Sequence, residues 1–249
     1  MRVFIINLKS NIERKEAMRQ QSNKIGLQVE FIEAVYGASM SNEELTKVVY
    51  DYPDCKLTKG EIGCSLSHLF IYEKMLRENI AHTLILEDDA ILPNKIYNVI
   101  SEIESMDDIK KPNVYLLNKV ETYINNRKIK SNVLDIYQAY EASGTHGYLI
   151  NKTAAKELLE KLQPIKYEAD MWGIFRFRNF INLYCTIPHV INTSDERKFD
   201  SFIEKERNVL REEREYYRHK LKKQEPNYQF YRLKDLFLRK FIYKIENVT

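Results

Sequence analysis

The sequence predicts an α/β protein with a mostly parallel central sheet. Short apolar runs of strand length alternate along the chain with segments of helical periodicity, as in strand–helix–strand units. Several of these runs end directly in polar turns, which is where such units place their loops. With 249 residues, 44% of them hydrophobic, the chain is long enough for one large domain with its own core.

The first half of the chain contains three predicted strands and two predicted helices. The strands are expected at residues 3–8, 29–35 and 83–86, and the helices at residues 11–25 and 58–79. Gly26 ends the first helix. The second helix has the clearest pattern, because Thr58 and Glu61 stand in capping-box spacing and apolar residues recur along one face. Glu61 is therefore interpreted as a capping residue rather than a catalytic one.

The second half is predicted to add three strands, a polar hairpin and a helix. We expect the strands at residues 114–117, 147–150 and 183–187, the hairpin over residues 120–138, and the helix at residues 153–162, ended by Pro164. Residues 202–223 have helical propensity, and an aromatic and basic stretch follows at residues 228–243. These changes in composition divide the chain into a body, residues 1–195, and a basic helical C-terminal segment, residues 196–249.

Charge is distributed unevenly between these two parts. The whole chain carries +3, but residues 197–249 hold 15 Lys and Arg against 9 Asp and Glu. A basic segment on a mildly acidic body is expected to meet an anionic partner. Nucleic acid is not the expected partner, because the basic residues are interleaved with Glu. The alternative is a helical arm that packs on the body or on a second subunit, which would make a homo-oligomer.

The sequence also predicts a cytoplasmic protein. No apolar run approaches the ~20 residues that a bilayer crossing needs, and the N-terminal apolar run is too short for a signal peptide. Cys55, Cys64 and Cys185 are widely spaced and form no C-x-x-C pair. This arrangement argues against a disulfide framework or a thiolate zinc site and favours a reducing compartment.

The most informative motif is the acidic triplet Glu87-Asp88-Asp89, which directly follows the predicted strand at residues 83–86. In open α/β sheets, ligands bind outside the carboxyl ends of the strands. Three adjacent carboxylates repel one another, and a hard divalent cation, Mg²⁺ or Mn²⁺, shared with substrate phosphates would offset this repulsion. The alternative is a solvated acidic turn or a helix N-cap. Because the sequence has neither a P-loop nor a Gly-x-Gly-x-x-Gly motif, a metal and diphosphate site here indicates a nucleotide-sugar enzyme.

Several motifs together resemble glycosyltransferase family 25. They are Asn7-Leu8 with Glu13-Arg14, Glu33-Ala34-Val35, the block Leu57-Thr58-Lys59-Gly60-Glu61-Ile62-Gly63-Cys64-Ser65-Leu66-Ser67-His68, Leu84-Ile85-Leu86-Glu87-Asp88-Asp89-Ala90, and Gly144-Thr145-His146-Gly147-Tyr148-Leu149-Ile150. This is the bacterial lipooligosaccharide galactosyltransferase family, which is related to the collagen galactosyltransferases. The resemblance covers roughly residues 3–188. Tyr36 departs from it, since relatives commonly have Asp before the glycine that is Gly37 here.

The resemblance implies a GT-A-like fold and an inverting β-galactosyltransferase that uses Mn²⁺ or Mg²⁺. The donor would be UDP-galactose, and the acceptor a saccharide hydroxyl of a lipid-linked lipooligosaccharide. The basic C-terminal segment would then lie on the anionic inner face of the cytoplasmic membrane, where such acceptors are found. Two other functions remain open: a sugar-nucleotide nucleotidyltransferase, and a non-catalytic saccharide-binding or membrane-scaffold protein. The hexose, the linkage and the acceptor are not fixed by the sequence.

The resemblance also assigns residues to the donor and to the cation. Asp89 is the expected metal ligand, with Glu87 and a late histidine, His189, completing the shell; a surface-loop role for His189 is the alternative. The expected donor contacts are Asn7, Leu8, Arg14, Ala34, Val35, Gly63, Ser67, His68, Glu87 and Asp88. Some of these have plainer explanations: Ala34 and Val35 as core residues, Arg14 as an exposed helix charge, and His68 as a packing histidine.

An inverting transfer needs a general base for the acceptor hydroxyl. Asp170 is the candidate, because it lies beside Trp172, the only tryptophan, and an apolar neighbour strengthens a carboxylate as a base. Glu168 is the reserve candidate. Trp172, Thr145 and His146 are expected to contact the acceptor, with Trp172 stacking on a sugar ring. The alternative for Asp170 and Trp172 is a loop aspartate next to an anchoring tryptophan.

Overall fold

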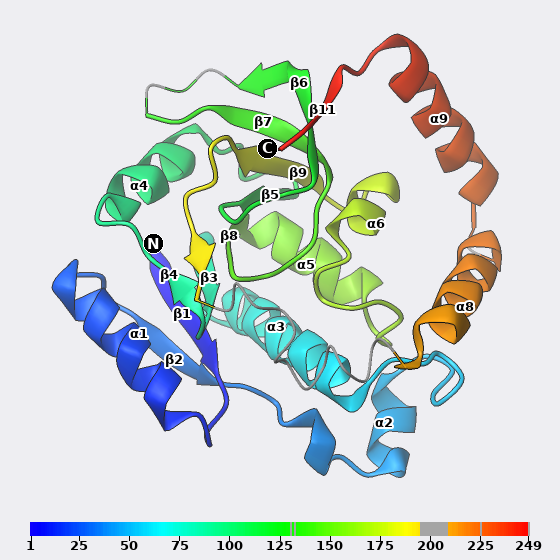
Figure 1. The fold of residues 1–249 in the computed structure, drawn as a ribbon, viewed down its shortest axis with the longest axis horizontal. Helices are drawn as coiled ribbons and strands as arrows, with labels where there is room; N and C mark the ends of the chain where they lie inside the picture. Colours follow the sequence, from blue (N-terminus) through cyan, green and yellow to red (C-terminus); the bar gives the residue numbers. More distant parts are fainter. Residues whose placement is uncertain (130, 132, 195–208, 225, 249) are drawn as a thin grey trace.

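The computed structural model describes residues 1–129, 131, 133–194, 209–224 and 226–248. Within these ranges the chain forms an α/β structure around one nine-stranded mixed sheet in the order β11-β6-β7-β9-β5-β8-β3-β1-β2 (Figure 1). The α/β class is therefore confirmed. A short second pairing joins β4 to β10 beside the main sheet.

The predicted elements of the first half are confirmed within one or two residues at most ends. They are β1 (Arg2–Asn7), α1 (Ile12–Lys24), β2 (Glu30–Glu33), α3 (Lys59–Arg77) and β3 (His82–Glu87). The capping box of α3 is present, with the Thr58 hydroxyl accepting from the Glu61 N–H and the Glu61 carboxylate accepting from the Thr58 N–H. Two elements between β2 and α3 were not predicted from the sequence. They are the 3₁₀ turn η1 (Gly37–Ser39) and the helix α2 (Asn42–Val48).

The second half likewise contains the predicted strands, hairpin and helix. Its elements are β4 (Ala90–Ile91), α4 (Ile96–Met106), β5 (Asn113–Leu116), β6 (Thr122–Ile129), β7 (Ile136–Glu141), β8 (Gly147–Asn151), α5 (Lys152–Lys161), α6 (Trp172–Phe177), β9 (Asn182–Thr186) and β10 (Asn192–Thr193). The helices α4 and α6 and the short pair β4 and β10 were not predicted.

The expected mostly parallel sheet is wrong. Among the described strands, β1–β2, β1–β3 and β5–β9 pair in parallel, whereas the other five pairings of the main sheet are antiparallel. The decisive strand is β8, which inserts between β3 and β5 and runs opposite to both. Alternation of strands and helices along a sequence indicates their order but not the direction of a strand that enters between two others.

The core consists of two apolar layers on opposite faces of the sheet. Side chains alternate along β1, so that Phe4 and Ile6 pack with α3 and α5 on one face, while Val3 and Ile5 pack with α1 and α4 on the other. This burial on both faces explains why the central strands read as continuous apolar runs rather than as alternating ones.

The C-terminal segment contacts the body through each of its described elements. The helix α8 (Arg211–Gln224) buries Arg214 and Leu221, and α9 (Tyr228–Phe241) leads into β11 (Ile245–Asn247), which pairs antiparallel with β6 (Figure 1). Helical structure is thus confirmed for most of the predicted stretch, whereas residues 202–208 and the predicted boundary at 195–196 lie outside the described residues. Among the described residues, no helix combines the length and apolar character needed to cross a bilayer.

Candidate functional site

The candidate site lies where the parallel strands β2, β1 and β3 reach their carboxyl ends. The parallel register places Asn7 of β1 opposite Glu33 of β2, and Ile6 of β1 opposite Glu87 of β3. The acidic triplet begins with Glu87 as the last residue of β3, and Asp88 and Asp89 form the turn before β4. The sequence therefore places the three carboxylates at the sheet edge where ligands of open α/β sheets bind.

His146 reaches the same edge because β8 is antiparallel to β3. Leu86 of β3 lies opposite Gly147 of β8, and the Glu87 N–H donates to the His146 carbonyl oxygen at 3.1 Å. The residue before β8 thereby meets the residue that ends β3. His146 was expected at the acceptor, and a mostly parallel sheet gives no reason for the start of this strand to meet the end of β3.

Glu87, Asp89 and His146 form a group of metal-ligand type. One ligand atom from each lies within 4.8 Å of the others, with His146 Nδ1 at 3.6 Å from Asp89 Oδ1 and at 3.7 Å from Glu87 Oε2. Asp89 Oδ1 and His146 Nδ1 are buried and have no hydrogen-bond partner among the described residues. Buried polar atoms are rarely left unpaired, so these two atoms indicate a ligand.

The residues of this group strongly affect one another's pKa values. Burial disfavours the charged His146 imidazole, but Asp89 and Glu87 outweigh it and raise the pKa of His146 to about 10. Burial likewise disfavours the ionised Glu87 carboxylate, but His146 and His68 hold the pKa of Glu87 well below its ordinary value. The acids of this group thus favour a positive charge beside them, and a metal ion that binds His146 Nδ1 would take the place of its proton.

The third acid, Asp88, points away from this group. Its carboxylate accepts from Asn7 Nδ2 at 2.7 Å and from Arg14 Nη1 at 3.2 Å. Burial, the largest effect, raises the pKa of Asp88 despite these two partners. The predicted residues Asn7, Arg14 and Asp88 are thus brought together, although Asn7 is itself buried and acts by holding Asp88.

A cleft of about 830 Å³ opens beside these residues at the ends of β1 and β2. The predicted donor contacts Leu8, Ala34 and Val35 line it, together with Tyr36, the residue that departs from the family pattern. Tyr36 is 60% exposed. Its ring is therefore available to a flat ligand in the cleft.

Gly63 and Ser67 support this cleft from behind and do not face it. A Cβ atom on Gly63 would lie 2.4 Å from the Val35 carbonyl oxygen, so only glycine lets α3 approach the end of β2 this closely. Ser67 is buried; its hydroxyl accepts from the Val35 N–H at 2.8 Å and donates to the Gly63 carbonyl oxygen at 2.7 Å. The expected direct donor contacts of these two residues are corrected to a positioning role.

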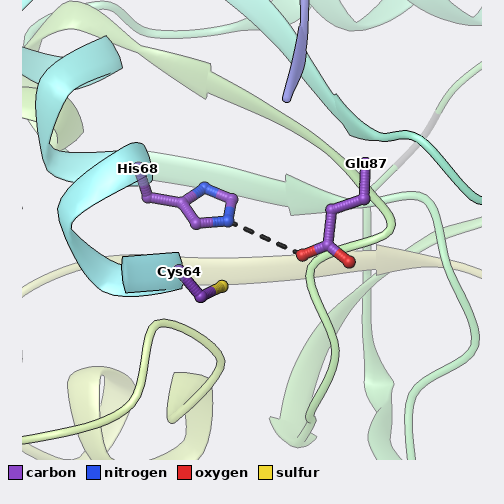
Figure 2. Close-up of side chains that lie close together, drawn as sticks. All are labelled: Cys64, His68 and Glu87. Atoms are coloured by element: carbon purple, nitrogen blue, oxygen red, sulfur yellow. Dashed lines mark ion pairs between the residues drawn. The ribbon is translucent and has the colours of Figure 1, made fainter. Parts of the chain in front are cut away.

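His68 is also buried, with 2% of its surface exposed, so the expected contact with a donor sugar is corrected as well. Its Nδ1 atom lies 2.7 Å from the Tyr148 hydroxyl, which lies 2.8 Å from the Tyr72 hydroxyl. Its other ring nitrogen, Nε2, faces Glu87 Oε1 at 3.7 Å (Figure 2). Cys64, His68 and Glu87 form a second group of ligand-type atoms, which shares Glu87 with the first.

Asp170 and Trp172 both form hydrogen bonds with the loop that carries His146. The Gly144 N–H donates to Asp170 Oδ2 at 3.3 Å, and the Trp172 indole N–H donates to the Gly144 carbonyl oxygen at 2.9 Å. Trp172 has no exposed surface, so the expected stacking of a sugar on its ring is wrong. Asp170 is half-buried and lines a cavity of about 550 Å³ between α6 and α9.

Three further expectations are changed by the geometry. His189 belongs to neither ligand-type group in the described part of the chain, and its Nε2 instead pairs with Asn192 Oδ1 at 2.8 Å. Glu168, the reserve base, is buried in ion pairs with Arg214 and Arg218 of α8, which leaves it no access to a substrate. Thr145 is buried and donates its hydroxyl to Glu87, so it orients that carboxylate rather than contacting an acceptor.

Two contacts of the structure gave no usable signal in the sequence. Thr193 donates to Asp89 Oδ2 at 2.9 Å because β10 pairs with β4, directly after the acidic turn. Arg214 reaches Glu61 at 2.6 Å across more than 150 positions of sequence. For His146 a signal did exist, because the family resemblance had already identified the Gly144-Thr145-His146 loop, but its partner depended on strand direction.

The sequence matches the family described as glycosyltransferase family 25 (LPS biosynthesis protein) over residues 1–172. The chain belongs to glycosyltransferase family 25. The matched region contains the acidic triplet, the helix α3 and the His146 loop, so Glu87, Asp89 and His146 all lie within it.

Individual relatives of this family 25 chain are similar over its body. A Haemophilus influenzae protein named lipooligosaccharide biosynthesis protein lic2B is 25% identical over 162 residues, which cover 62% of this chain and 61% of that protein. Procollagen galactosyltransferase 2 of Mus musculus is 26% identical over 170 residues, 63% of this chain and 27% of that protein. The matches thus span less than two thirds of either relative.

Among solved structures, a glycosyltransferase involved in the glycosylation of the major capsid of PBCV-1 superposes with a TM-score of 0.38 and 10% identity. The superposition covers 85% of this chain and 100% of that one.

Proposed function

We propose that this chain is an inverting glycosyltransferase with a GT-A-type donor site that transfers galactose from UDP-galactose to a saccharide hydroxyl of lipooligosaccharide. Family membership supports the reaction class, and the names of the Haemophilus and mouse relatives support the acceptor and the sugar, respectively. Family membership also favours this transfer over sugar-nucleotide synthesis and over non-catalytic saccharide binding. The observation that carries the proposal is the group of Glu87, Asp89 and His146 with its two unpaired buried atoms.

The residues of this group fit a divalent cation. Carboxylate oxygens suit Mn²⁺ and Mg²⁺, and an imidazole nitrogen in the set favours Mn²⁺. Glu87, Asp89 and His146 would hold the ion, which would supply positive charge for the diphosphate and for the departing UDP. Thr145 fixes the Glu87 carboxylate, and Thr193 fixes Asp89 through Oδ2, which would leave Oδ1 to bind the ion.

The cleft at the ends of β1 and β2 is proposed to bind the nucleoside. Leu8, Ala34 and Val35 would contact the uracil, and the exposed Tyr36 ring would stack on it. Asp88, held by Asn7, would accept a hydrogen bond from a ribose hydroxyl. Arg14, which pairs with Asp88 from the start of α1, would reach the diphosphate.

Asp170 is proposed to take the proton from the acceptor hydroxyl as that oxygen attacks the anomeric carbon. It stands at the cavity between α6 and α9, which has room for a short saccharide. Its hydrogen bond to Gly144 ties it to the loop of His146, so that base and cation site belong to one connected unit. Attack opposite the UDP leaving group would convert the α-linked donor sugar into a β-linked product.

The helix α9 is proposed to rest on an anionic membrane surface that presents the acceptor. It buries no residue in the described structure, and its exposed apolar side chains recur at helical spacing: Phe230, Leu233, Leu236, Phe237 and Phe241. Arg232, Lys234, Arg239 and Lys240 flank them and complement anionic headgroups.

Liposome sedimentation tests this surface. The variant Leu233→Ser/Phe237→Ser is expected to lose most of its binding to vesicles that contain anionic phospholipid, because both side chains lie on the apolar face. The control Ile12→Ser removes a similarly exposed side chain from α1 and should bind as the unmodified chain does. Absence of vesicle binding by the unmodified chain, with a dimer that the double variant dissociates, would assign α9 to a second copy instead.

A donor screen tests the activity itself. UDP release is measured across UDP-hexoses with a lipooligosaccharide acceptor, with and without Mn²⁺. We expect release with UDP-galactose to exceed release with the other donors and to require the cation. Asp89→Asn should reduce the rate at least about 100-fold, because it removes a charge that holds the ion.

The exposed Asp54→Asn serves as the matched control and should leave the rate unchanged. Equal UDP release without Mn²⁺, or a wild-type rate in Asp89→Asn, would contradict the proposed role of the group. Release from a different UDP-hexose alone would replace galactose and leave that role intact.

A further inference from the structure

A second group of ligand-type atoms lies on the other side of Glu87. Cys64 Sγ, His68 Nε2 and a Glu87 carboxylate oxygen all lie within 4.8 Å of one another. Cys64 and His68 stand one turn apart on α3, and both side chains point toward Glu87 at the end of β3 (Figure 2). The group thus combines a thiol, an imidazole and a carboxylate from two packed elements.

The imidazole of His68 carries the strongest sign of a missing ligand. His68 is 2% exposed, and within the described residues its Nε2 atom has no hydrogen-bond partner. Glu87 Oε1 lies 3.7 Å away, beyond hydrogen-bond reach. Nitrogen and oxygen ligands that share a tetrahedral ion at about 2.1 Å stand roughly 3.4 Å apart, which is close to the separation found here.

The surroundings of His68 are those of a metal-binding histidine. Its Nδ1 lies 2.7 Å from the buried Tyr148 hydroxyl, which in turn lies 2.8 Å from the buried Tyr72 hydroxyl. The Tyr148 hydroxyl can accept a hydrogen bond from Nδ1–H and donate one to Tyr72, which leaves the Nε2 lone pair directed at Glu87. Such an outer partner fixes the tautomer of a ligating histidine.

We propose that Cys64, His68 and Glu87 form a zinc-binding site distinct from the group of Glu87, Asp89 and His146. A thiolate with an imidazole selects Zn²⁺ over Mg²⁺ or Mn²⁺, and three protein ligands leave a fourth position for water. Binding would release the Cys64 thiol proton to solvent. Glu87 can serve both groups at once, because Oε1 faces His68 and Oε2 faces His146.

The sequence argued against a thiolate zinc site because no C-x-x-C pair is present. The structure supplies what the spacing lacked, a carboxylate brought to the helix by the sheet. Glu87 is shared with the proposed transfer site, but Cys64 and His68 take no part in that transfer, so tests through these two residues separate the zinc site from that function.

Cobalt titration of the full chain tests the site, because Co²⁺ occupies zinc sites and a thiolate ligand gives it a charge-transfer band in the near ultraviolet. We expect the band to appear at one equivalent, to be displaced by Zn²⁺, and to be lost in Cys64→Ser. Cys55→Ser and Cys185→Ser replace the two other, buried cysteines and should keep it. Asp89→Asn, which affects only the neighbouring group, should also keep it.

No band in the unmodified chain, or an unchanged band in Cys64→Ser, would overturn the proposal. Circular dichroism confirms that each variant is folded. Alkylation of the unmodified chain gives a reading that needs no variant: Zn²⁺ should slow the reaction of iodoacetamide with Cys64 at least tenfold, and an unchanged rate would overturn the site.

Discussion

The two ends of β3 carry similar side chains that differ in how completely their hydrogen bonds are satisfied. At the amino end, the side chain of Asp107 has no exposed surface and accepts hydrogen bonds from His82, Asn113, Tyr115 and Asn151 at 2.7–2.8 Å. At the carboxyl end, Glu87 and Asp89 also meet histidines, yet His68, His146 and Asp89 each leave a buried polar atom unpaired within the described structure.

The difference shows how a structural polar cluster can be distinguished from a binding site. Both ends contain a carboxylate, a histidine and a tyrosine, so residue types alone do not separate them. The number of satisfied hydrogen bonds distinguishes them. A cluster in which every polar atom has a partner stabilises the fold, whereas a cluster with unpaired polar atoms can bind a ligand through them. Substitutions at the amino end should therefore change stability, and substitutions near the carboxyl end should change activity.

The largest expected effect is on catalysis. Asp170→Asn should reduce sugar transfer by about 100-fold to 10,000-fold, because it removes the proposed proton acceptor. The amide can still accept the hydrogen bond from Gly144, so the loop of His146 should stay in place and UDP-galactose binding should be retained. Steady-state rates together with calorimetric donor affinity separate the two effects.

The exposed Asp135→Asn is the control for this substitution and should leave both quantities unchanged. A near wild-type rate in Asp170→Asn would exclude Asp170 as the base. Loss of donor binding in the same proportion as the rate would instead assign it to the donor site.

At the other end of β3, the effect should be on stability alone. Asp107→Asn should lower the free energy of unfolding by about 2 to 3 kcal/mol, because four buried donors would lose a charged acceptor and an amide would replace it. Its neighbour Asp108 is exposed, and Asp108→Asn should leave the free energy of unfolding nearly unchanged. Urea unfolding measures both, and equal costs for the two variants would remove the distinction between the two ends.

Much of the fold was predictable because its signals are local. The first strand and helix, the capping box of Thr58 and Glu61, and the strand that runs into the acidic triplet each depend on neighbouring residues. The direction of β8 was not predictable, because it depends on which strands it enters between. The approach of His146 to Glu87 depends on this direction, whereas the family resemblance had suggested His189 as the late histidine ligand.

The candidate site shows the same limit. The carboxylates were found from their place after an apolar run, but burial decides how each neighbour acts. Trp172 and Glu168 looked available in sequence and are both buried in the structure. The Glu168 ion pairs come from Arg214 and Arg218 of α8, a contact between segments that no local pattern connects.

The smallest expected effect is a pH dependence of opposite sign at the two ends. Burial disfavours the ionised Asp107, but its four hydrogen bonds hold the pKa of Asp107 below the ordinary value. Its contribution to stability is therefore complete above the unfolded value of about 3.9 and is lost as the pH falls through that range. The pKa of His146 is raised to about 10, so its contribution is complete below about 6.5 and is lost as the pH rises toward 10.

Free energies of unfolding, measured across pH in the absence of divalent cations, test these two pH dependences. Asp107→Asn should flatten the acid side of the stability profile and His146→Gln the alkaline side, each by about 1 kcal/mol or more. If both variants changed the same side, the charge states assigned to the two ends would be wrong.

The most direct test is anomalous diffraction from crystals soaked with UDP and Mn²⁺. We expect one manganese peak in contact with Glu87, Asp89 and His146 and with the diphosphate oxygens, and the uridine in the cleft beside Leu8 and Val35. A manganese peak away from these three side chains, or UDP bound with no manganese between its phosphates and Asp89, would contradict the account.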